Sequence, residues 1–305
     1  MTKKTMAVLI PTWKRPEKLR KCLQALTSSD MMPDAIYVVN RPEDTESATV
    51  IESFLNSLPI TKVLVNEPGV IYAENAGLKQ VKEDYICFLD DDAYVPTHWC
   101  RVIHEKLSSD ANIIGVGGPD IIFQDLKNDY RRIVNKVGMI SSYGRLTGNH
   151  HHEVKQDMIV DVLKGVNMSF KREFVPQLDQ ELQSSIREGN GSHWELDICL
   201  QMSKHGKFLF TPELELQHDS NHSHFIEDKV AVNNARNYTY VILKNFTFFK
   251  KIAFLFYVMS VGNTNAYGIL KCVQELLRQR RLRPLKIYGL NLLGIYKGIR
   301  TYITS

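Results

Sequence analysis

Three consecutive carboxylates, Asp90, Asp91 and Asp92, follow the apolar run ICFL and precede Pro96 by four residues. In extended chain, Asp90 and Asp92 would point to the same side of the strand and Asp91 would point away. Carboxylate oxygens suit Mg²⁺ or Mn²⁺, and these ions keep open positions for phosphate oxygens. The alternative is an acidic turn or a helix cap. We favour a divalent-cation site.

Strands and amphipathic helices are expected to alternate around these carboxylates. The predicted strands cover residues 6–11, 35–40, 61–66 and 85–90, and the predicted helices cover residues 17–26, 48–58, 71–81 and 97–107. This order is typical of βαβ units. We therefore expect an α/β fold, with a doubly wound, mainly parallel sheet and helices on both faces. Ligands bind such sheets at the carboxyl ends of the strands, where Pro11, Thr12, Asn40 and Asp90 fall.

The composition is that of a globular protein, because 44% of the 305 residues are hydrophobic and 24% are charged. The five cysteines form no CxxC pair, which argues against a disulfide framework or a zinc site and suits a reducing cytoplasm. The first apolar run, of about five residues before Pro11, is too short for the core of a signal peptide. We expect a cytoplasmic protein.

The charge is unevenly distributed and indicates two parts, residues 1–225 and 226–305. The second part carries 13 Lys and Arg against three Asp and Glu, whereas the first carries 25 against 31. Its apolar runs of about ten residues fall short of the roughly 20 that a membrane span needs. We expect a helical extension that contacts an anionic membrane at the inner face of the plasma membrane, or else a helical cap on the first part. No nucleic-acid partner is expected.

The run His150–His152 raises the question of a second metal site. Side chains of adjacent residues diverge unless the backbone turns them inward, so an exposed polar loop is the favoured interpretation.

Five segments in order resemble the inverting family 2 glycosyltransferases, which have a GT-A fold and use nucleotide-diphosphate sugars. The segments are AVLIPTWKRPEKLRKCLQAL, IYVVNRPEDTES, ENAGLKQVKEDYICFLDDDA, LKGVNMSFKREF and WELDICLQMSKHGKFLFTPELELQH. Together they fall between residue 6 and about residue 225. The resemblance implies a GT-A-like domain over residues 1–225, a Mn²⁺ or Mg²⁺ cofactor, and a glycan or lipid-linked saccharide as acceptor.

The resemblance also implies roles for single residues on the donor side. Asp92 would be the principal metal ligand, and His218 would complete the binding of the metal or the diphosphate. Asn40 stands where the family usually has an Asp that contacts the nucleobase of the donor. The preferred nucleobase can therefore differ from the common uracil of uridine donors. The residues placed around the donor are Pro11, Thr12, Arg15, Asn40, Asn75, Asp90 and Asp91.

The acidic segment supplies the expected catalytic base, which would deprotonate the acceptor hydroxyl as it attacks the anomeric carbon. Glu195 falls at the family's position for this base, although the family most often has Glu-Asp where this chain has Trp194-Glu195. Asp197 remains the competing candidate.

Two other functions have to be weighed. A nucleotidyltransferase acting on sugar phosphates also combines a doubly wound sheet with metal-binding carboxylates, but it would usually carry a glycine-rich phosphate loop after the first strand, and IPTWKRPEK contains no glycine. A non-catalytic, membrane-associated protein that binds nucleotide sugars would be favoured by loss of the carboxylate cluster or of the acidic segment, and both are present.

Overall fold

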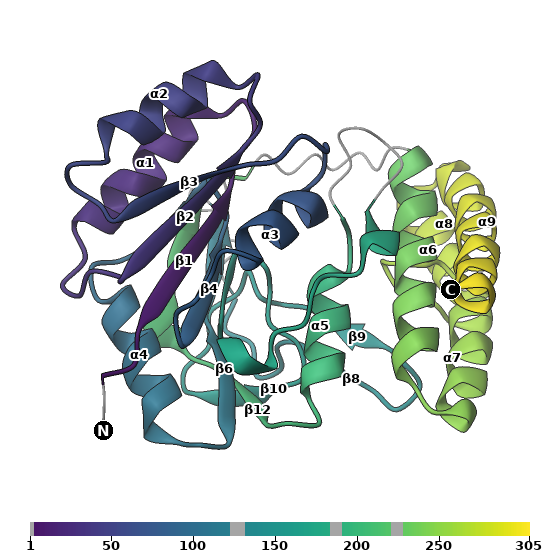
Figure 1. The fold of residues 1–305 in the computed structure, drawn as a ribbon. Coiled ribbons are helices and arrows are strands. Elements are labelled where there is room, and N and C mark those ends of the chain that lie inside the picture. The colour runs from purple at the N-terminus through teal and green to yellow at the C-terminus, as the bar shows by residue number, and fades with distance from the viewer. Residues whose placement is uncertain (1–2, 123–131, 184–190, 221–227) are drawn as a thin grey trace.

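The computed structural model describes residues 3–122, 132–183, 191–220 and 228–305. The first half follows the predicted alternation (Figure 1). Its strands are β1 (Met6–Pro11), β2 (Ala35–Asn40), β3 (Ile60–Leu64) and β4 (Tyr85–Leu89), and its helices are α1 (Pro16–Thr27), α2 (Thr45–Ser53), α3 (Val70–Leu78) and α4 (Trp99–Ser109). The predicted elements are confirmed, except that α2 ends five residues before the predicted helix does.

An eight-stranded sheet forms the centre of the molecule. It adds β6 (Ile113–Gly117), β10 (Met158–Val160), β11 (Asn167–Lys171) and β12 (Lys207–Phe210) to the first four strands, in the order β10-β12-β6-β11-β4-β1-β2-β3. The pairs β1–β2, β1–β4, β2–β3 and β6–β12 are parallel. Strand β11 runs antiparallel to both of its neighbours, as β10 does to β12. The expected mainly parallel sheet is confirmed.

Helices cover both faces of the sheet because side chains alternate along each strand. In β1, Met6, Val8 and Ile10 pack in the core that contains α1 and α4. Ala7 and Leu9 pack in the other core, which contains α3 and α5 (Trp194–Met202). The expected doubly wound arrangement is confirmed.

A smaller sheet lies at the carboxyl ends of the central strands, in the order β5-β13-β7. It consists of β5 (Ala93–Tyr94), β13 (Leu216–His218) and β7 (Asp120–Ile122). His218 pairs with Ala93 on one side and with Ile122 on the other. This pairing brings a residue from late in the chain next to the turn that contains the three carboxylates. Other short elements among the described residues are the hairpin β8 (Met139–Ile140) and β9 (Leu146–Thr147) and the 3₁₀ helices η2 (Arg172–Phe174), η3 (Gln180–Leu182) and η4 (Pro212–Leu214).

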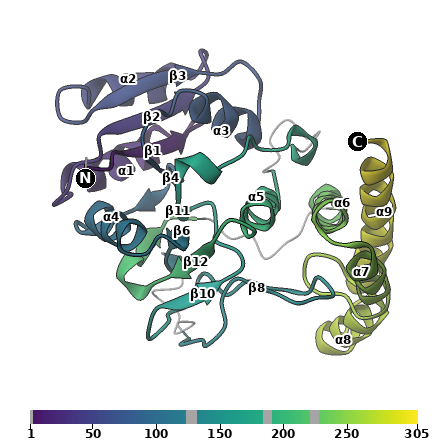
Figure 2. The same cartoon turned by 60° about the horizontal axis from the view of Figure 1, so that its bottom comes forward.

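The C-terminal extension consists of α6 (Asp228–Asn245), α7 (Phe248–Ser260), α8 (Ile269–Gln279) and α9 (Arg283–Thr304). Helix α6 lies between α5 and α9 (Figure 2). Tyr238 and Phe254 of the extension belong to the same apolar core as Phe170 of the sheet. None of the described helices is both long and apolar enough to cross a bilayer.

Helices α6 and α9 approach closely through small residues. A Cβ atom at Gly298 would lie 2.5 Å from the carbonyl oxygen of Arg236, and one at Gly294 would lie 2.5 Å from that of Val232. Asn291 donates from Nδ2 to the carbonyl oxygen of Ala231 (3.0 Å). This contact fixes α9 on α6.

Candidate active site

A cavity of about 850 Å³ opens at the carboxyl ends of the central strands. Its wall includes side chains from β1, from the turn after β4, from the start of α5 and from the end of β13. Of the residues predicted from the sequence, these line it: Pro11, Thr12, Arg15, Asp90, Asp91, Asp92, Glu195 and His218. Asn40, Asn75 and Asp197 are not part of its wall.

Asp91 and Asp92 are tied to the first strand and helix. The Thr12 hydroxyl donates to Asp91 Oδ2 (2.7 Å), and Arg15 Nη1 donates to Asp91 Oδ1 (3.0 Å) and Asp92 Oδ2 (3.1 Å). Lys18 Nζ donates to Asp92 Oδ2 (3.2 Å). Asp90 and Asp92 share one group of possible metal ligands and Asp91 does not belong to it, although Arg15 Nη1 contacts both Asp91 and Asp92. The three aspartates lie in a turn rather than in extended chain, so the alternation of side chains does not apply to them.

Burial and charge separate the three carboxyl groups. Burial raises the pKa of Asp91 to about 7, although the Arg15 guanidinium opposes this shift. Burial also acts on Asp92, but its hydrogen bond with His218 and the charges of Arg15 and Lys18 lower its pKa. The pKa of Asp90 is raised, first by burial and then by the charge of Asp92.

The donor set around Asp90 fits a divalent cation. One ligand atom from each of Asp90, Asp92 and His218 lies within 4.8 Å of the others. No side chain among the described residues donates a hydrogen bond to the Asp90 carboxylate, whereas Asp91 and Asp92 are neutralised by Arg15 and Lys18. The charge that lacks a partner is therefore that of Asp90. Two carboxylates and one imidazole suit Mn²⁺ better than Mg²⁺, which prefers oxygen ligands.

The two candidate bases occupy very different surroundings. Glu195 lines the cavity, and burial raises the pKa of its carboxyl group. Asp197 is fully buried and accepts from Gln201 Nε2 (2.8 Å), Lys244 Nζ (2.8 Å) and Asn245 Nδ2 (2.7 Å). Gln201 lies on α5 itself, whereas Lys244 and Asn245 lie on α6, so two of the three hydrogen bonds join α5 to α6 and engage the Asp197 carboxylate in holding the extension.

Asn75 and Asn40 are held by the protein's own backbone. Asn75 donates from Nδ2 to the carbonyl oxygen of Leu178 (2.8 Å) and accepts from the Leu178 amide (2.8 Å). Asn40 is buried at the end of β2, next to Arg41, which does line the cavity. The amide of Asn40 donates to the carbonyl oxygen of Asp44 (3.5 Å), and its Oδ1 has no partner among the described residues.

Several cavity residues carry no sequence signal that singles them out. The guanidinium carbon Cζ of Arg41 lies 4.4 Å from the centre of the Trp13 ring. These two residues follow β1 and β2 and line the cavity where the nucleotide is expected. Lys164 lines the cavity and also contacts Asp120. Glu74 is buried beneath the site, and burial, followed by the charges of Asp90 and Glu195, raises its pKa well above the usual range.

The expectation of an exposed loop for the three histidines is wrong. His150 is buried, and its Nε2 lies 2.9 Å from the carbonyl oxygen of Val162. His151 contacts Asp120, with Nδ1 2.9 Å from Oδ2. The backbone turns inward here because Asn149 adopts a left-handed conformation with φ of 65°. An isolated positive φ cannot be read from the sequence.

Comparison with known proteins identifies the first half of the chain. Residues 7–173 match the family described as Glycosyl transferase family 2. A stretch of 107 residues is 29% identical to the uncharacterized glycosyltransferase YwdF of Bacillus subtilis (strain 168), which covers 34% of this chain and 39% of that protein. A stretch of 113 residues is 24% identical to the glycosyltransferase GlyA of Streptococcus pneumoniae serotype 4, covering 37% of this chain and 16% of that protein. These relatives extend well beyond the matched segments.

Two solved structures share the fold over nearly the whole chain. TarS 1–349 of S. aureus superposes with a TM-score of 0.56 at 15% identity, covering 98% of this chain and 89% of that one. GalNAc-T7, solved with UDP, GalNAc and Mn²⁺, superposes with a TM-score of 0.63 at 15% identity, covering 99% of this chain and 58% of that one. The expected GT-A-like fold is confirmed. The match to the family ends before Glu195 and His218, so their assignment rests on the geometry of the cavity.

Proposed function

This chain belongs to glycosyl transferase family 2 and is a glycosyltransferase, and we propose that it moves a sugar from a nucleotide-diphosphate donor to an acceptor hydroxyl with inversion of the anomeric centre. The proposal rests on one observation above all. The three-aspartate turn and Glu195, which come from distant parts of the chain, line one cavity. Diphosphate-binding groups and a base therefore face the same space.

On the donor side, the chain supplies groups suited to a nucleoside diphosphate. Trp13 and Arg41 offer flat surfaces on which a base can stack. Asp90, Asp92 and His218 would hold Mn²⁺ or Mg²⁺. When bound, this cation neutralises the charge that develops on the leaving diphosphate. Arg15 and Lys18 hold Asp92 in place through hydrogen bonds of 3.1 and 3.2 Å.

On the acceptor side, Glu195 is the proposed general base. Its raised pKa brings it closer to neutral pH, where a base combines a useful ionised fraction with basicity. Removing the proton of the acceptor hydroxyl opposite the departing diphosphate produces inversion. Asp197 is not proposed as the base, because its three hydrogen bonds and complete burial occupy the carboxylate.

The test is a screen for nucleoside diphosphate release from a panel of nucleotide sugars, with Mn²⁺ and Mg²⁺ in parallel. We expect turnover of at least one donor, and loss of turnover in Asp92→Ala. Calorimetry with a nucleoside diphosphate and Mn²⁺ should show that Asp92→Ala loses metal-dependent binding. Asp219→Ala is the matched control, because Asp219 also approaches Lys18 (3.9 Å) but belongs to neither group of possible metal ligands. Unchanged binding in Asp92→Ala would remove it from the metal site.

The extension supports a second part of the proposal, contact with an anionic membrane that carries a lipid-linked acceptor. Helices α7 and α8 expose an apolar face, defined by these side chains: Phe248, Phe249, Ile252, Phe256, Met259, Ile269, Leu270, Val273 and Leu277. Phe249 is 82% exposed and Phe256 is 76% exposed. Spacings of three and four residues along each helix keep most of these side chains on one side of that helix.

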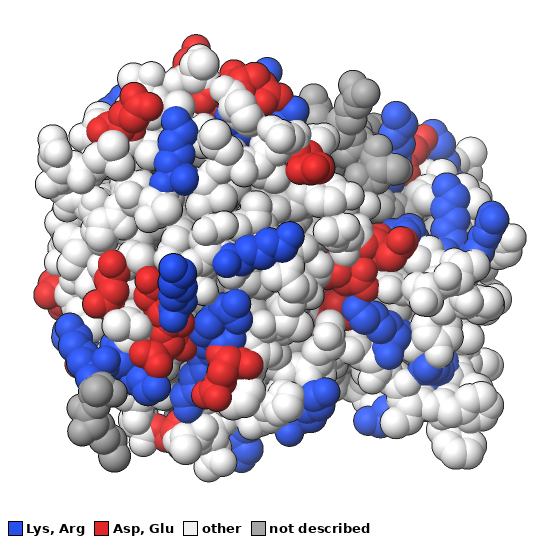
Figure 3. Space-filling view, in the orientation of Figure 1, with Lys and Arg blue, Asp and Glu red and all other residues white. Residues whose placement is uncertain are grey.

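Basic side chains near this face favour an anionic membrane as its binding partner. The surface over α7–α9, on the right in Figure 3, is mainly uncharged and is interrupted by basic side chains. Exposed Lys250, Arg278, Arg280 and Arg281 belong to the segments that carry the apolar face or follow it directly. Each Lys or Arg near an anionic surface contributes about 1 kcal/mol, and apolar side chains enter the headgroup boundary.

Sedimentation with phosphatidylglycerol vesicles at low and high salt tests this contact. We expect binding that weakens with salt, and we expect the double variant Phe249→Ser, Phe256→Ser to bind at least about tenfold more weakly, since burial of one Phe contributes about 1.5–3 kcal/mol. Leu64→Ser is the control, because Leu64 is 55% exposed on β3, outside this face. No binding at low salt would refute the contact. A dimer that dissociates in the double variant would instead assign the face to a second copy.

A further inference from the structure

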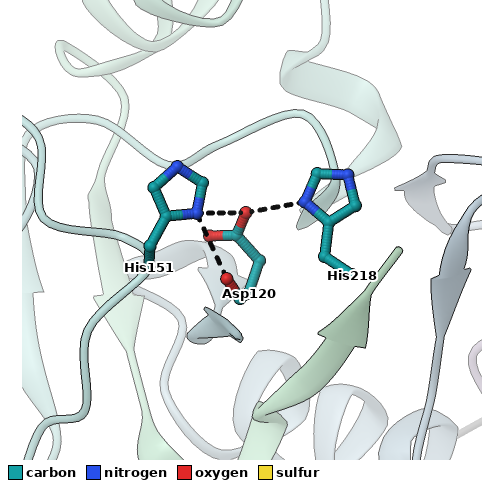
Figure 4. Close-up of side chains that lie close together, drawn as sticks. All are labelled: Asp120, His151 and His218. Carbon is teal, nitrogen blue, oxygen red and sulfur yellow. Dashed lines mark hydrogen bonds and ion pairs between the residues drawn. The ribbon is translucent and has the colours of Figure 1, made fainter. Parts of the chain in front are cut away.

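A buried carboxylate behind the metal ligands is not explained by donor or acceptor binding. Asp120, the first residue of β7, is 0% exposed and does not line the cavity. Its Oδ2 lies 3.2 Å from His218 Nδ1, 2.9 Å from His151 Nδ1 and 3.1 Å from Lys164 Nζ. Figure 4 shows both imidazole rings turned toward this carboxylate. A charge placed here without a role would be costly to bury.

A second metal site is one explanation, because Asp120, His151 and His218 lie within ligand distance of one another. Lys164 argues against it. Its ammonium group lies 3.1 Å from Asp120 Oδ2 and 2.7 Å from His151 Nε2, so it already supplies the positive charge in this cluster. A divalent ion would have to bind beside that ammonium group, and the two like charges would repel each other.

The two nitrogens of His218 point to different partners. Nδ1 faces Asp120 Oδ2, and Nε2 faces Asp92 Oδ1 at 3.3 Å. When Nδ1 carries a proton and donates it to Asp120, the lone pair of the neutral ring is on Nε2, on the side of Asp90 and Asp92. A carboxylate that accepts from the far nitrogen of a metal-binding imidazole fixes both the tautomer and the orientation of the ring.

We propose that Asp120 is a positioning residue that holds His218 with Nε2 directed toward Asp90 and Asp92, where these residues would bind a divalent cation. The inference rests on the proposed function, in which His218 is a metal ligand. Strand pairing supports it, because β7 and β13 are parallel neighbours with Asp120 opposite Leu216. The sheet therefore sets the distance between the carboxylate and the ring independently of any ligand. Lys164 and His151 contact Asp120 Oδ2 as well, at 3.1 and 2.9 Å, and fix the carboxylate in this position.

The test measures Mn²⁺ itself, without substrate. Mn²⁺ affinity is determined by titration followed by electron paramagnetic resonance, and pulsed measurements report whether a histidine nitrogen is coupled to the ion. Asp120→Leu removes the acceptor at nearly the same volume, and we expect about 10–100-fold weaker Mn²⁺ binding and loss of the nitrogen coupling. Asp120→Asn keeps an acceptor oxygen for Nδ1 but loses the charge, so we expect a smaller loss of affinity and a retained coupling.

Two further variants make the result decisive. Asp157→Asn removes the charge of a carboxylate that pairs with Lys106 and belongs neither to the cavity wall nor to a group of possible metal ligands, and we expect its Mn²⁺ affinity and nitrogen coupling to match the wild type. His218→Ala tests the premise: if it binds Mn²⁺ as the wild type does, the proposed metal site fails, whatever Asp120 does. If His218→Ala weakens binding but Asp120→Leu leaves affinity and coupling unchanged, the positioning role alone is refuted. If the Leu variant does not fold, unchanged affinity in Asp120→Asn refutes it equally.

Discussion

Replacing Glu195 by Gln separates catalysis from stability at this site. The amide has the shape of the carboxylate but cannot take a proton from the acceptor. Loss of a general base typically lowers the rate by about 10²–10⁴, which corresponds to about 3–5 kcal/mol in the barrier. We expect a value near 10³, because the neighbouring carboxylates are not placed to replace it: Glu74 is 1% exposed, Asp197 is 0% exposed, and Asp90 is assigned to the cation.

The same substitution should not destabilise the protein. Burial raises the pKa of Glu195 in the folded state, so its ionised form is less favourable there than in the unfolded chain. The stability of the wild type therefore falls as pH rises from the ordinary Glu range through the raised pKa. Gln has no such charge to bury. The Tm of Glu195→Gln should equal that of the wild type near pH 4 and exceed it at pH 7–8.

The assay uses the donor identified by the nucleotide-sugar screen. Nucleoside diphosphate release gives the turnover rate, calorimetry with the nucleoside diphosphate and Mn²⁺ shows whether donor binding is retained, and thermal unfolding between pH 4 and 8 gives Tm. Asp197→Asn is measured alongside. Nearly wild-type turnover in Glu195→Gln, together with lost turnover in a folded Asp197→Asn protein, would refute the assignment of Glu195 and identify Asp197 as the base.

Three other substitutions test the packing around the site. Asp197→Ala leaves Lys244 without its fully buried partner and should cost about 3–5 kcal/mol, seen as a Tm lowered by about 6–12 °C; an unchanged Tm would mean that the ion pair does not hold α5 to α6. Gly298→Val should destabilise the protein by about 1–3 kcal/mol, because the new Cβ would meet the Arg236 carbonyl oxygen. Gly289→Val on the same helix has open space around it and should not destabilise in this way. Equal effects of the two substitutions would refute the close contact between α6 and α9. Burial lowers the pKa of His150 to about 4, so the stability that this residue contributes is lost as pH falls from about 6.5 to about 4. His150→Gln should therefore reduce the fall of Tm over that pH range. Parallel Tm curves for the two proteins would contradict this.

The first half of the fold could be predicted because its signals are local. Strand β1 is bounded by Pro11, and Leu19, Cys22, Leu23 and Leu26 recur with the period of a helix; the structure buries all four on one face of α1. Such patterns depend only on neighbours along the chain. The β5-β13-β7 sheet carried no comparable signal, since its strands are two or three residues long, and β13 pairs with residues about 120 positions earlier in β5 and about 100 positions earlier in β7.

The candidate site was predictable where residue type alone limits the chemistry. Three adjacent carboxylates indicate a cationic partner wherever they fold. Which cation pairs with which carboxylate depends on three-dimensional neighbours. Arg15 and Lys18 form ion pairs with Asp91 and Asp92, whereas Asp90 forms none within the part of the chain that the structure describes. Glu195 and Asp197 are equally acidic in the sequence, and only the position of α6 distinguishes them.

The sequence by itself determined the α/β class, the family, and the chemistry of the carboxylate cluster, because periodicity, composition and motif order are properties of neighbouring residues. Tertiary structure alone decided that Asp197 holds the extension and that Glu195 faces the cavity. It also decided that His151 and Asp120 turn inward behind His218. Distance, burial and hydrogen-bond partners depend on which distant segments meet, and a linear pattern does not encode those contacts locally.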